Sequence, residues 1–285
     1  IMSLLTLAHP NGSEEVCGFG ELEFRHADPD PSANRAGRFV FIKMLRFLRL
    51  QRKLGWTIEQ TDRAIAALYP PSLKPVVPDD GKNEERLDEA FRVLLIRLGV
   101  VKRVMDALGV KPAEDLQPLL ACFAPIDTYG ASSLYRRMFL SGTNRDPAFA
   151  DDGYGDMPNA SEKLLDHAET LRAAFRLSAD EFAQIAGALR FDGGMPLTLS
   201  NISEVYRRGW LARTLDISVR ELLMLIGSAG WNPFAAPDAT DTETAPILAF
   251  IDLVRKHRSQ SLTLAQSLYV FWDKDADGRQ ARPLA

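Results

Sequence analysis

The sequence predicts an all-α fold, an irregular array of helical hairpins that repeat degenerately, with a short strand or hairpin near the N-terminus. One helix start recurs: an apolar residue, then Ser or Thr, then Glu or Gln three positions later, then an apolar run. The starts lie at Thr57/Gln60, Ser178/Glu181, Ser218/Glu221 and Thr263/Gln266. The last three begin at 178, 218 and 263, so they are 40 and 45 residues apart, a spacing typical of helical repeats. Each opens the shorter helix of a pair. An irregular helical domain with well-capped helices is the alternative.

Composition is that of a globular chain, with room for one large domain or two ordinary ones. Of 285 residues, 46% are hydrophobic and 25% are charged. The net charge of −4 argues against a surface built to attract nucleic acid. No apolar run reaches the roughly 20 residues of a membrane-spanning helix, and the first residues do not resemble a signal peptide. Cys17 and Cys122 provide neither a disulfide framework nor a zinc half-site.

The N-terminal segment, 1–34, is predicted to be irregular apart from a strand within 20–28. In that stretch Leu22, Phe24 and His26 alternate with charged residues. The chain places Ile before its first Met and closes on no domain-ending element. We therefore expect a piece of a longer polypeptide that continues beyond residue 285.

A first helical region is predicted over 35–142. Its helices, each bounded by Gly, Pro or a capping residue, span 35–55, 57–68, 83–109 (as one helix or two), 112–123 and 132–142. Pro112 is suited to open the fourth of these, and Pro118 is expected to kink it.

After a loop over 143–160, a second helical region over 161–285 holds three hairpins. Their helices are predicted over 161–175 with 178–190, 200–215 with 218–230, and 242–258 with 263–273. Two capped starts also fit hydrophobic staples, at Leu177/Phe182 and Ile217/Leu222. Each short helix can bury one face only when a neighbouring hairpin covers it, so repetition builds a continuous core.

A basic amphipathic helix is predicted at the start of the first region. Lys43, Arg46, Arg49 and Arg52 form a stripe three residues apart, opposite a side that carries Phe39, Ile42, Leu45 and Leu48. A helix of this kind can lie on a membrane or a phosphate backbone. We favour packing in a bundle, with the stripe paired to acids elsewhere in the chain.

The segment 272–284 begins like a calcium loop. Asp273, Asp275 and Asp277, followed by Gly, match the pattern D-x-D-x-D-G and are weak metal candidates. The bidentate Glu of such loops is missing, because Leu284 stands at its position. An acidic turn after a helix is the favoured interpretation.

No other pattern points to catalysis. The four histidines, His9, His26, His167 and His257, do not lie at metal-ligand spacing, and we interpret His167 as solvated or partly packed. Neither a phosphate-binding loop nor a nucleophile elbow occurs. We therefore predict no catalytic residue, no cofactor and no enzyme activity.

Three longer blocks resemble, in the same order, parts of the A subunits of bacterial Tc (toxin complex) insecticidal toxins. They are RFLRLQRKLGWTIEQTDRAIAAL at 46–68, LLACFAPIDTYGASSLYRRMFL at 119–140 and LTLSNISEVYRRGWLARTLDISVRELLMLIGSAGWNPF at 197–234. Together they place roughly residues 20–275 inside the family pattern. The family carries an aromatic residue, usually Trp, where Gln51 stands here.

The resemblance implies a segment of the α-helical shell of a pore-forming toxin and virulence factor, secreted or held at the bacterial cell surface. Such A subunits form bell-shaped homo-pentamers around a channel, through which a toxic enzyme from B/C-type cargo subunits passes into the target cell. The implied partners are the other pentamer subunits and the cargo subunits, with a host receptor for the whole protein. For this segment the resemblance implies neither nucleic-acid nor membrane contact. The alternative is a free-standing helical-repeat interaction module.

Overall fold

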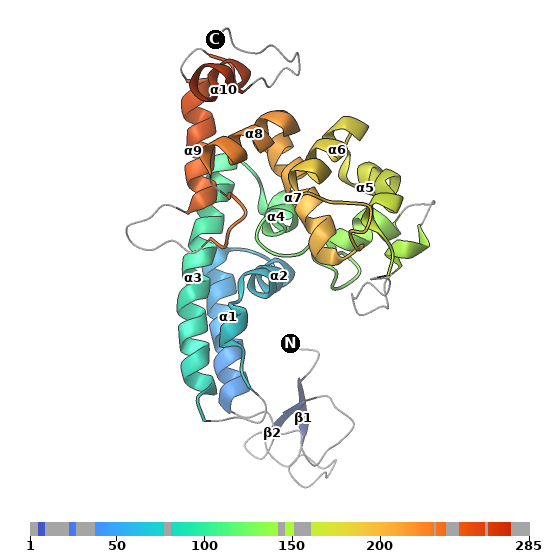
Figure 1. Cartoon of the computed structure of the whole chain (residues 1–285). Coiled ribbons are helices and arrows are strands. Elements are labelled where there is room, and N and C mark those ends of the chain that lie inside the picture. Colours follow the sequence, from blue (N-terminus) through green and yellow to red (C-terminus); the bar gives the residue numbers. More distant parts are fainter. Residues whose placement is uncertain are drawn as a thin grey trace.

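The computed structural model describes residues 5–8, 23–26, 38–76, 81–141, 146–150, 161–230, 232–237, 245–259 and 262–274. In these residues the fold is all-α, as predicted, with one small hairpin of strands (Figure 1). The α-helices are α1 (Arg38–Leu54), α2 (Ile58–Leu68), α3 (Asn83–Leu108), α4 (Pro112–Leu120), α5 (Ala168–Phe175), α6 (Ala179–Ala188), α7 (Leu199–Thr214), α8 (Val219–Ala229), α9 (Pro246–Arg258) and α10 (Leu264–Trp272). No described helix is long and apolar enough to cross a membrane.

The strand predicted within 20–28 is present as β2 (Glu23–His26). It pairs antiparallel with β1 (Leu5–Ala8), so that Leu5 lies opposite His26 and Ala8 lies opposite Glu23. The partner strand falls in the segment that we predicted to be irregular.

All four predicted helix starts form complete capping boxes, at α2, α6, α8 and α10. At α6 the backbone N–H of Glu181 donates to Ser178 Oγ at 3.2 Å, and the backbone N–H of Ser178 donates to Glu181 Oε2 at 2.8 Å. Because each box satisfies two otherwise unpaired backbone donors, the short helices begin at fixed residues.

The three C-terminal hairpins are α5–α6, α7–α8 and α9–α10, and their short helices pack in a row. Helix α8 contacts both α6 and α10 (Figure 1). The first helices of the hairpins diverge, since α5 packs against α7 whereas α9 packs against α3. The array is therefore irregular, because the third hairpin packs through α9 against α3 of the first helical region.

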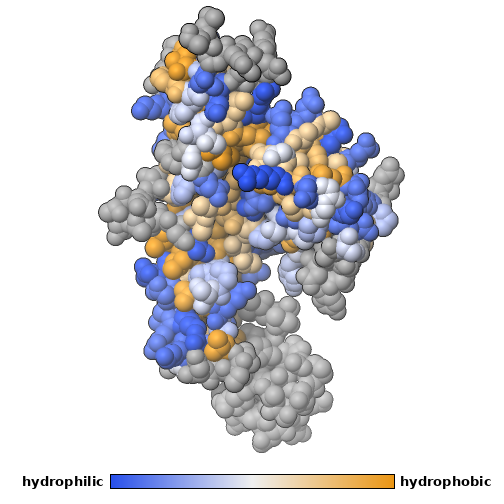
Figure 2. Space-filling view, in the orientation of Figure 1, coloured by the Kyte–Doolittle hydropathy of each residue, from blue (hydrophilic) through white to orange (hydrophobic). Residues whose placement is uncertain are grey.

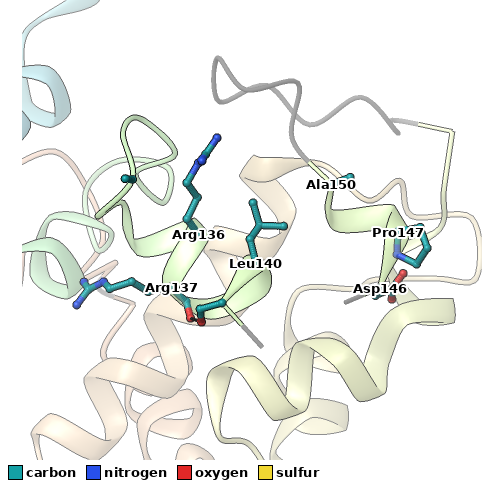
Figure 3. A pocket seen from close by; sticks show the side chains of 8 residues that line it. Arg136, Arg137, Leu140, Asp146, Pro147 and Ala150 are labelled. Atoms are coloured by element: carbon teal, nitrogen blue, oxygen red, sulfur yellow. Dashed lines mark hydrogen bonds between the residues drawn. The ribbon is translucent and has the colours of Figure 1, made fainter. Parts of the chain in front are cut away.

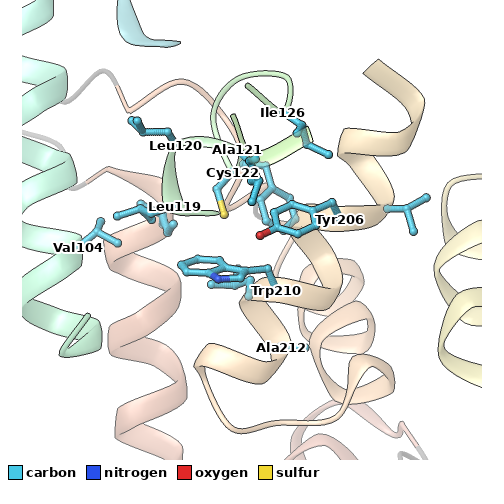
Figure 4. Close-up of a cluster of buried hydrophobic side chains, with 14 of the residues drawn as sticks. Val104, Leu119, Leu120, Ala121, Cys122, Ile126, Tyr206, Trp210 and Ala212 are labelled. Atoms are coloured by element: carbon cyan, nitrogen blue, oxygen red, sulfur yellow. The ribbon is translucent and has the colours of Figure 1, made fainter. Parts of the chain in front are cut away.

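One cluster of buried hydrophobic residues extends from Leu50 in α1 to Leu268 in α10, so both predicted helical regions share a core. Its centre lies where the residues after α4 meet α7, and includes Cys122, Tyr206 and Trp210 (Figure 4). Helix α7 approaches Leu177 closely, because a Cβ at Gly209 would lie 2.8 Å from Leu177 Cδ2.

The predicted helix over 161–175 is shorter than expected. Residues 161–163 are not helical, the next four form a 3₁₀ turn, η6 (Leu164–His167), and only α5 is α-helical. The backbone N–H of Leu164 donates to Met195 O at 2.8 Å, and that of Leu197 donates to Glu162 O at 2.7 Å. These bonds hold the segment in an extended pairing, which prevents an α-helix from starting there.

The predicted helix over 132–142 and the predicted loop over 143–160 also differ from expectation. The helix includes a π-helical turn, η4 (Arg136–Leu140). The loop contains a 3₁₀ turn, η5 (Pro147–Phe149), whose Phe149 is completely buried. Elsewhere 83–109 forms the single helix α3, and α4 continues through Pro118 to Leu120.

Helix α1 packs in the bundle as predicted, although one residue of its predicted apolar side is exposed. Phe47 and Leu50 are buried, whereas Leu45, which we placed on the apolar side, is 50% exposed. Of the basic stripe, Arg46 pairs with Asp88 of α3, and its guanidinium lies 5.3 Å from the ring centre of Phe91. One cation of the stripe therefore has the predicted acidic partner.

Candidate functional site

The carboxylate of Asp146 joins η5 to α5, in an arrangement that we call the Asp146 clasp. One oxygen accepts from the backbone N–H of Ala148 at 3.0 Å. The other lies 2.7 Å from Nδ1 of His167 and accepts from the Thr170 hydroxyl at 2.9 Å. Phe149 packs edge-on against the imidazole, with ring centres 5.8 Å apart.

Titration of the clasp follows from these contacts. Burial works to lower the pKa of His167, but the hydrogen bonds and charges of Asp146 and Glu162 outweigh it and raise that pKa above its ordinary value. Burial likewise works to raise the pKa of Asp146, and the bonds from Ala148, His167 and Thr170 lower it instead. Both shifts favour the charged pair.

The clasp has the parts of a catalytic triad in a different order. In a triad the nucleophile bonds the imidazole nitrogen opposite the carboxylate. Here Nε2 of His167 lies 3.5 Å from a carboxylate oxygen of Glu162, and the Thr170 hydroxyl donates to Asp146 rather than to the imidazole. The arrangement can fasten one segment to another, and it does not activate Thr170.

A pocket of about 480 Å³ lies beside the clasp. The turn η4 supplies Arg136, Arg137 and Leu140 on one side, and the η5 segment supplies Asp146 and Pro147 on the other (Figure 3). The two arginine side chains extend in different directions, and Arg137 donates to Gln117 of α4. The guanidinium groups therefore do not converge on one ligand.

Buried polar contacts fasten the residues after α4 to α7. The backbone N–H of Ile126 donates to Ser203 Oγ at 2.9 Å, and Arg207 donates to Ala124 O at 3.1 Å and to Glu204 at 2.9 Å. Burial lowers the pKa of the largely buried Arg207 guanidinium. These contacts hold charge and hydroxyl groups inside the core, where an unpaired group would be costly.

Cys122 lies in the same core and is a free thiol. Burial raises its pKa to about 12, and nearby Arg207 offsets only part of that rise. A thiol with this pKa stays protonated and unreactive, so Cys122 acts as a small apolar residue, as predicted. Cys17 lies outside the described residues.

The weak calcium candidates are only partly described. Asp273 follows α10 in a left-handed conformation, with φ 55°. Its backbone N–H donates to carbonyl oxygens of the last turn of the helix, those of Leu268 and Tyr269. Asp275 and Asp277 lie outside the described residues. Within the described part of the chain, no three His, Cys, Asp or Glu side chains gather as a metal site.

The three histidines that the structure describes belong to different elements. His167 is partly packed, as predicted, with a side chain that is 17% exposed. His257 is buried next to Trp272, with ring centres 5.5 Å apart, and burial, aided by Lys256, lowers its pKa. His26 belongs to β2, and His9 lies outside the described residues.

Sequence reasoning missed the clasp and the buried residues of η5. One local signal was available, since Asp followed by Pro is a common start for a helical turn. Asp146 does cap Pro147–Phe149. Neither Ser203 nor Arg207 gave any signal, because both occupy polar positions in a helical sequence pattern.

Comparison with known proteins leaves the family open. No protein-family model matches the sequence. No curated protein matches it either.

Proposed function

We propose that this chain is a non-enzymatic shell segment of a large oligomeric, pore-forming bacterial toxin of the Tc A subunit type. It works by assembly: the segment supports the channel and the delivery of a toxic partner subunit, and it catalyses nothing itself. Its partners in this proposal are neighbouring subunits of a homo-pentamer and B/C-type cargo subunits.

The observation that carries the proposal is that the three blocks of resemblance, far apart in sequence, pack together. Arg63 of the first block donates to Ser132 of the second at 2.8 Å and lies 3.0 Å from the carboxylate of Asp127. The second block meets the third through the buried bond from Ile126 to Ser203. Residues that share a packed unit are constrained together, so a common pattern over all three blocks fits a common architecture.

The departure at Gln51 also has a structural account. Its side-chain amide donates to the carbonyl oxygen of Trp56 at 2.5 Å, across the turn between α1 and α2. Trp56 itself is buried. A hydrogen bond thus spans the turn at the position where the family pattern leads us to expect an aromatic residue.

A free-standing interaction module is the second candidate, and one observation favours it. Helix α10 is the last of the three short helices in the row, and its Val270 and Phe271 are 63% and 56% exposed. Leu225 of α8 stands as far from its capping residue as Val270 does in α10, and Leu225 is buried. A repeat module would use such a face to bind another protein.

Electron microscopy of the natural gene product, purified from its source, tests the proposal. A large five-fold assembly is expected if the chain is part of a toxin shell. A small monomer close to the 31.7 kDa of this chain would refute that and favour the interaction module. The two results require natural polypeptides of very different length, so denaturing electrophoresis of the same sample gives an independent check.

A further inference from the structure

A groove of about 460 Å³ lies on α6 and α8 and reaches Lys274, two residues after the end of α10. Leu223 and Met224 of α8 provide apolar surface, and both are only partly buried. Figure 2 shows hydrophobic surface in the region of α8 with hydrophilic residues around it. The volume is in the range of sites that hold a small ligand or one or two side chains of a peptide.

Two polar side chains of the groove have buried oxygens that lack a hydrogen-bond partner among the described residues. They are Oε1 of Gln184 in α6 and Oγ of Ser228 in α8. Buried polar atoms are nearly always paired, so an unpaired one calls for a partner beyond the residues that the structure describes. An amide oxygen accepts and a hydroxyl both donates and accepts, which is the complement of a peptide backbone.

The described charged residues of the groove are cations. Among the residues that the structure describes, Arg220 and Lys274 line it, no acidic side chain does, and neither cation has an ion-pair partner. The backbone N–H of Lys274 donates to Leu268 O at 3.1 Å, which connects this residue to the C-terminal end of α10. Cations that lie beside an apolar surface without an ion-pair partner favour a ligand that carries carboxylates.

We propose that this groove binds an acidic peptide segment of a partner protein. An apolar side chain of the peptide lies on Leu223 and Met224, its backbone pairs with Gln184 and Ser228, and its carboxylates pair with Arg220 and Lys274. The inference goes beyond the proposed function and depends only on the groove. It holds whether or not the chain is part of a toxin shell.

Glycine 227 allows a sharp test. Gly227 lines the groove, has ordinary helical backbone, and a Cβ added there would meet no atom within 4 Å. The Cβ introduced by Gly227→Leu therefore meets no clash, its longer side chain adds bulk to the groove lining, and the substitution removes a residue that disfavours helices. Gly99 in α3 has the same open surroundings away from the groove, so Gly99→Leu is the matched control.

The experiment measures fluorescence anisotropy of a labelled hexapeptide, Glu-Leu-Glu-Leu-Glu-Leu, titrated with the full chain. We expect saturable binding that Gly227→Leu weakens by about tenfold or more, which corresponds to about 1.4 kcal/mol, while Gly99→Leu changes it by less than about twofold. Arg220→Glu, a surface substitution, should weaken binding by a similar factor and reduce its salt dependence.

Two further peptides separate the contributions. Replacement of every Glu by Lys, or of every Leu by Ser, should abolish binding. The proposal is wrong if the Glu-Leu peptide does not bind, if Gly227→Leu binds it as the unmodified chain does, or if the Lys-Leu peptide binds equally well. Thermal unfolding followed by circular dichroism establishes that each variant is folded.

Discussion

Truncation of Phe149 tests whether η5 belongs to the core. The ring is completely buried and stacks on Phe139, with centres 4.3 Å apart and planes 8° from parallel. Its carbonyl oxygen accepts from the Tyr135 hydroxyl at 2.9 Å. Phe149→Ala removes the ring and leaves the carbonyl in place, so the side chain is tested separately from the backbone bond.

The expected loss follows from these contacts. Burial of a Phe side chain contributes about 1.5–3 kcal/mol, and a stacked aromatic pair adds about 0.5–1.5 kcal/mol. A cavity left in the core raises the cost further, and Phe→Ala substitutions in cores typically cost about 3–5 kcal/mol. We expect a loss in this range. Phe149→Leu, which retains most of the volume, should cost less, about 1.5 kcal/mol.

Urea denaturation followed by far-UV circular dichroism measures the free energy of unfolding, and an unchanged slope indicates that the denatured state is comparable. Tyr129→Ala is the control, because this side chain is 75% exposed and should change stability by less than about 0.5 kcal/mol. A loss below about 1 kcal/mol for Phe149→Ala would refute the packing of η5 in the core. It would instead support the unpacked loop that the sequence predicts for 143–160.

Three further outcomes are expected. Leu222→Asp places a carboxylate in a completely buried position, so it should cost several kcal/mol, and an unchanged melting temperature would show that the hairpin faces are wrongly assigned. Ser203→Ala leaves the buried N–H of Ile126 unpaired and should cost about 1–3 kcal/mol, measured by urea denaturation; a loss of a few tenths would contradict the buried bond. His167→Gln should change the pH dependence of stability. The raised pKa of His167 contributes stability that is complete below 6.5 and is lost as pH rises through the folded-state pKa. The lowered pKa of Asp146 contributes stability that is complete above 3.8 and is lost as pH falls. The difference between the unmodified chain and His167→Gln, measured by urea midpoints across pH, should therefore be largest between these values; a difference that does not vary with pH would exclude a charged pair.

Features that depend on neighbours in sequence could be predicted. Each capping box is complete within four residues, so Ser178 and Glu181 identify the start of α6 without knowledge of the fold. Gly55 and Gly109 have positive φ at the ends of α1 and α3, which glycine adopts without strain. Helix order, most helix ends and the all-α class follow from such local signals.

Features that depend on distant partners could not be predicted. The first turn of the 161–175 segment is not α-helical, because its backbone pairs with residues 195–197. Phe149 lies in a polar stretch, and its burial depends on Phe139, ten positions before it. The groove likewise depends on how α6 and α8 pack, so that Gln184 and Arg220, each unremarkable in its own helix, line one surface.

The buried polar contacts explain how an irregular array can have one defined packing. Apolar faces attract without strong direction, so helices that pack through Leu and Ala alone could slide by a turn at little cost. The bond from Ile126 to Ser203 and that from Arg207 to Ala124 allow only one register between α7 and the residues after α4, since any shift would leave buried polar groups unpaired. The Asp146 clasp does the same for η5 and α5. Segments joined in this way resist sliding as well as separation, which is the mechanical property that the shell proposed above would require.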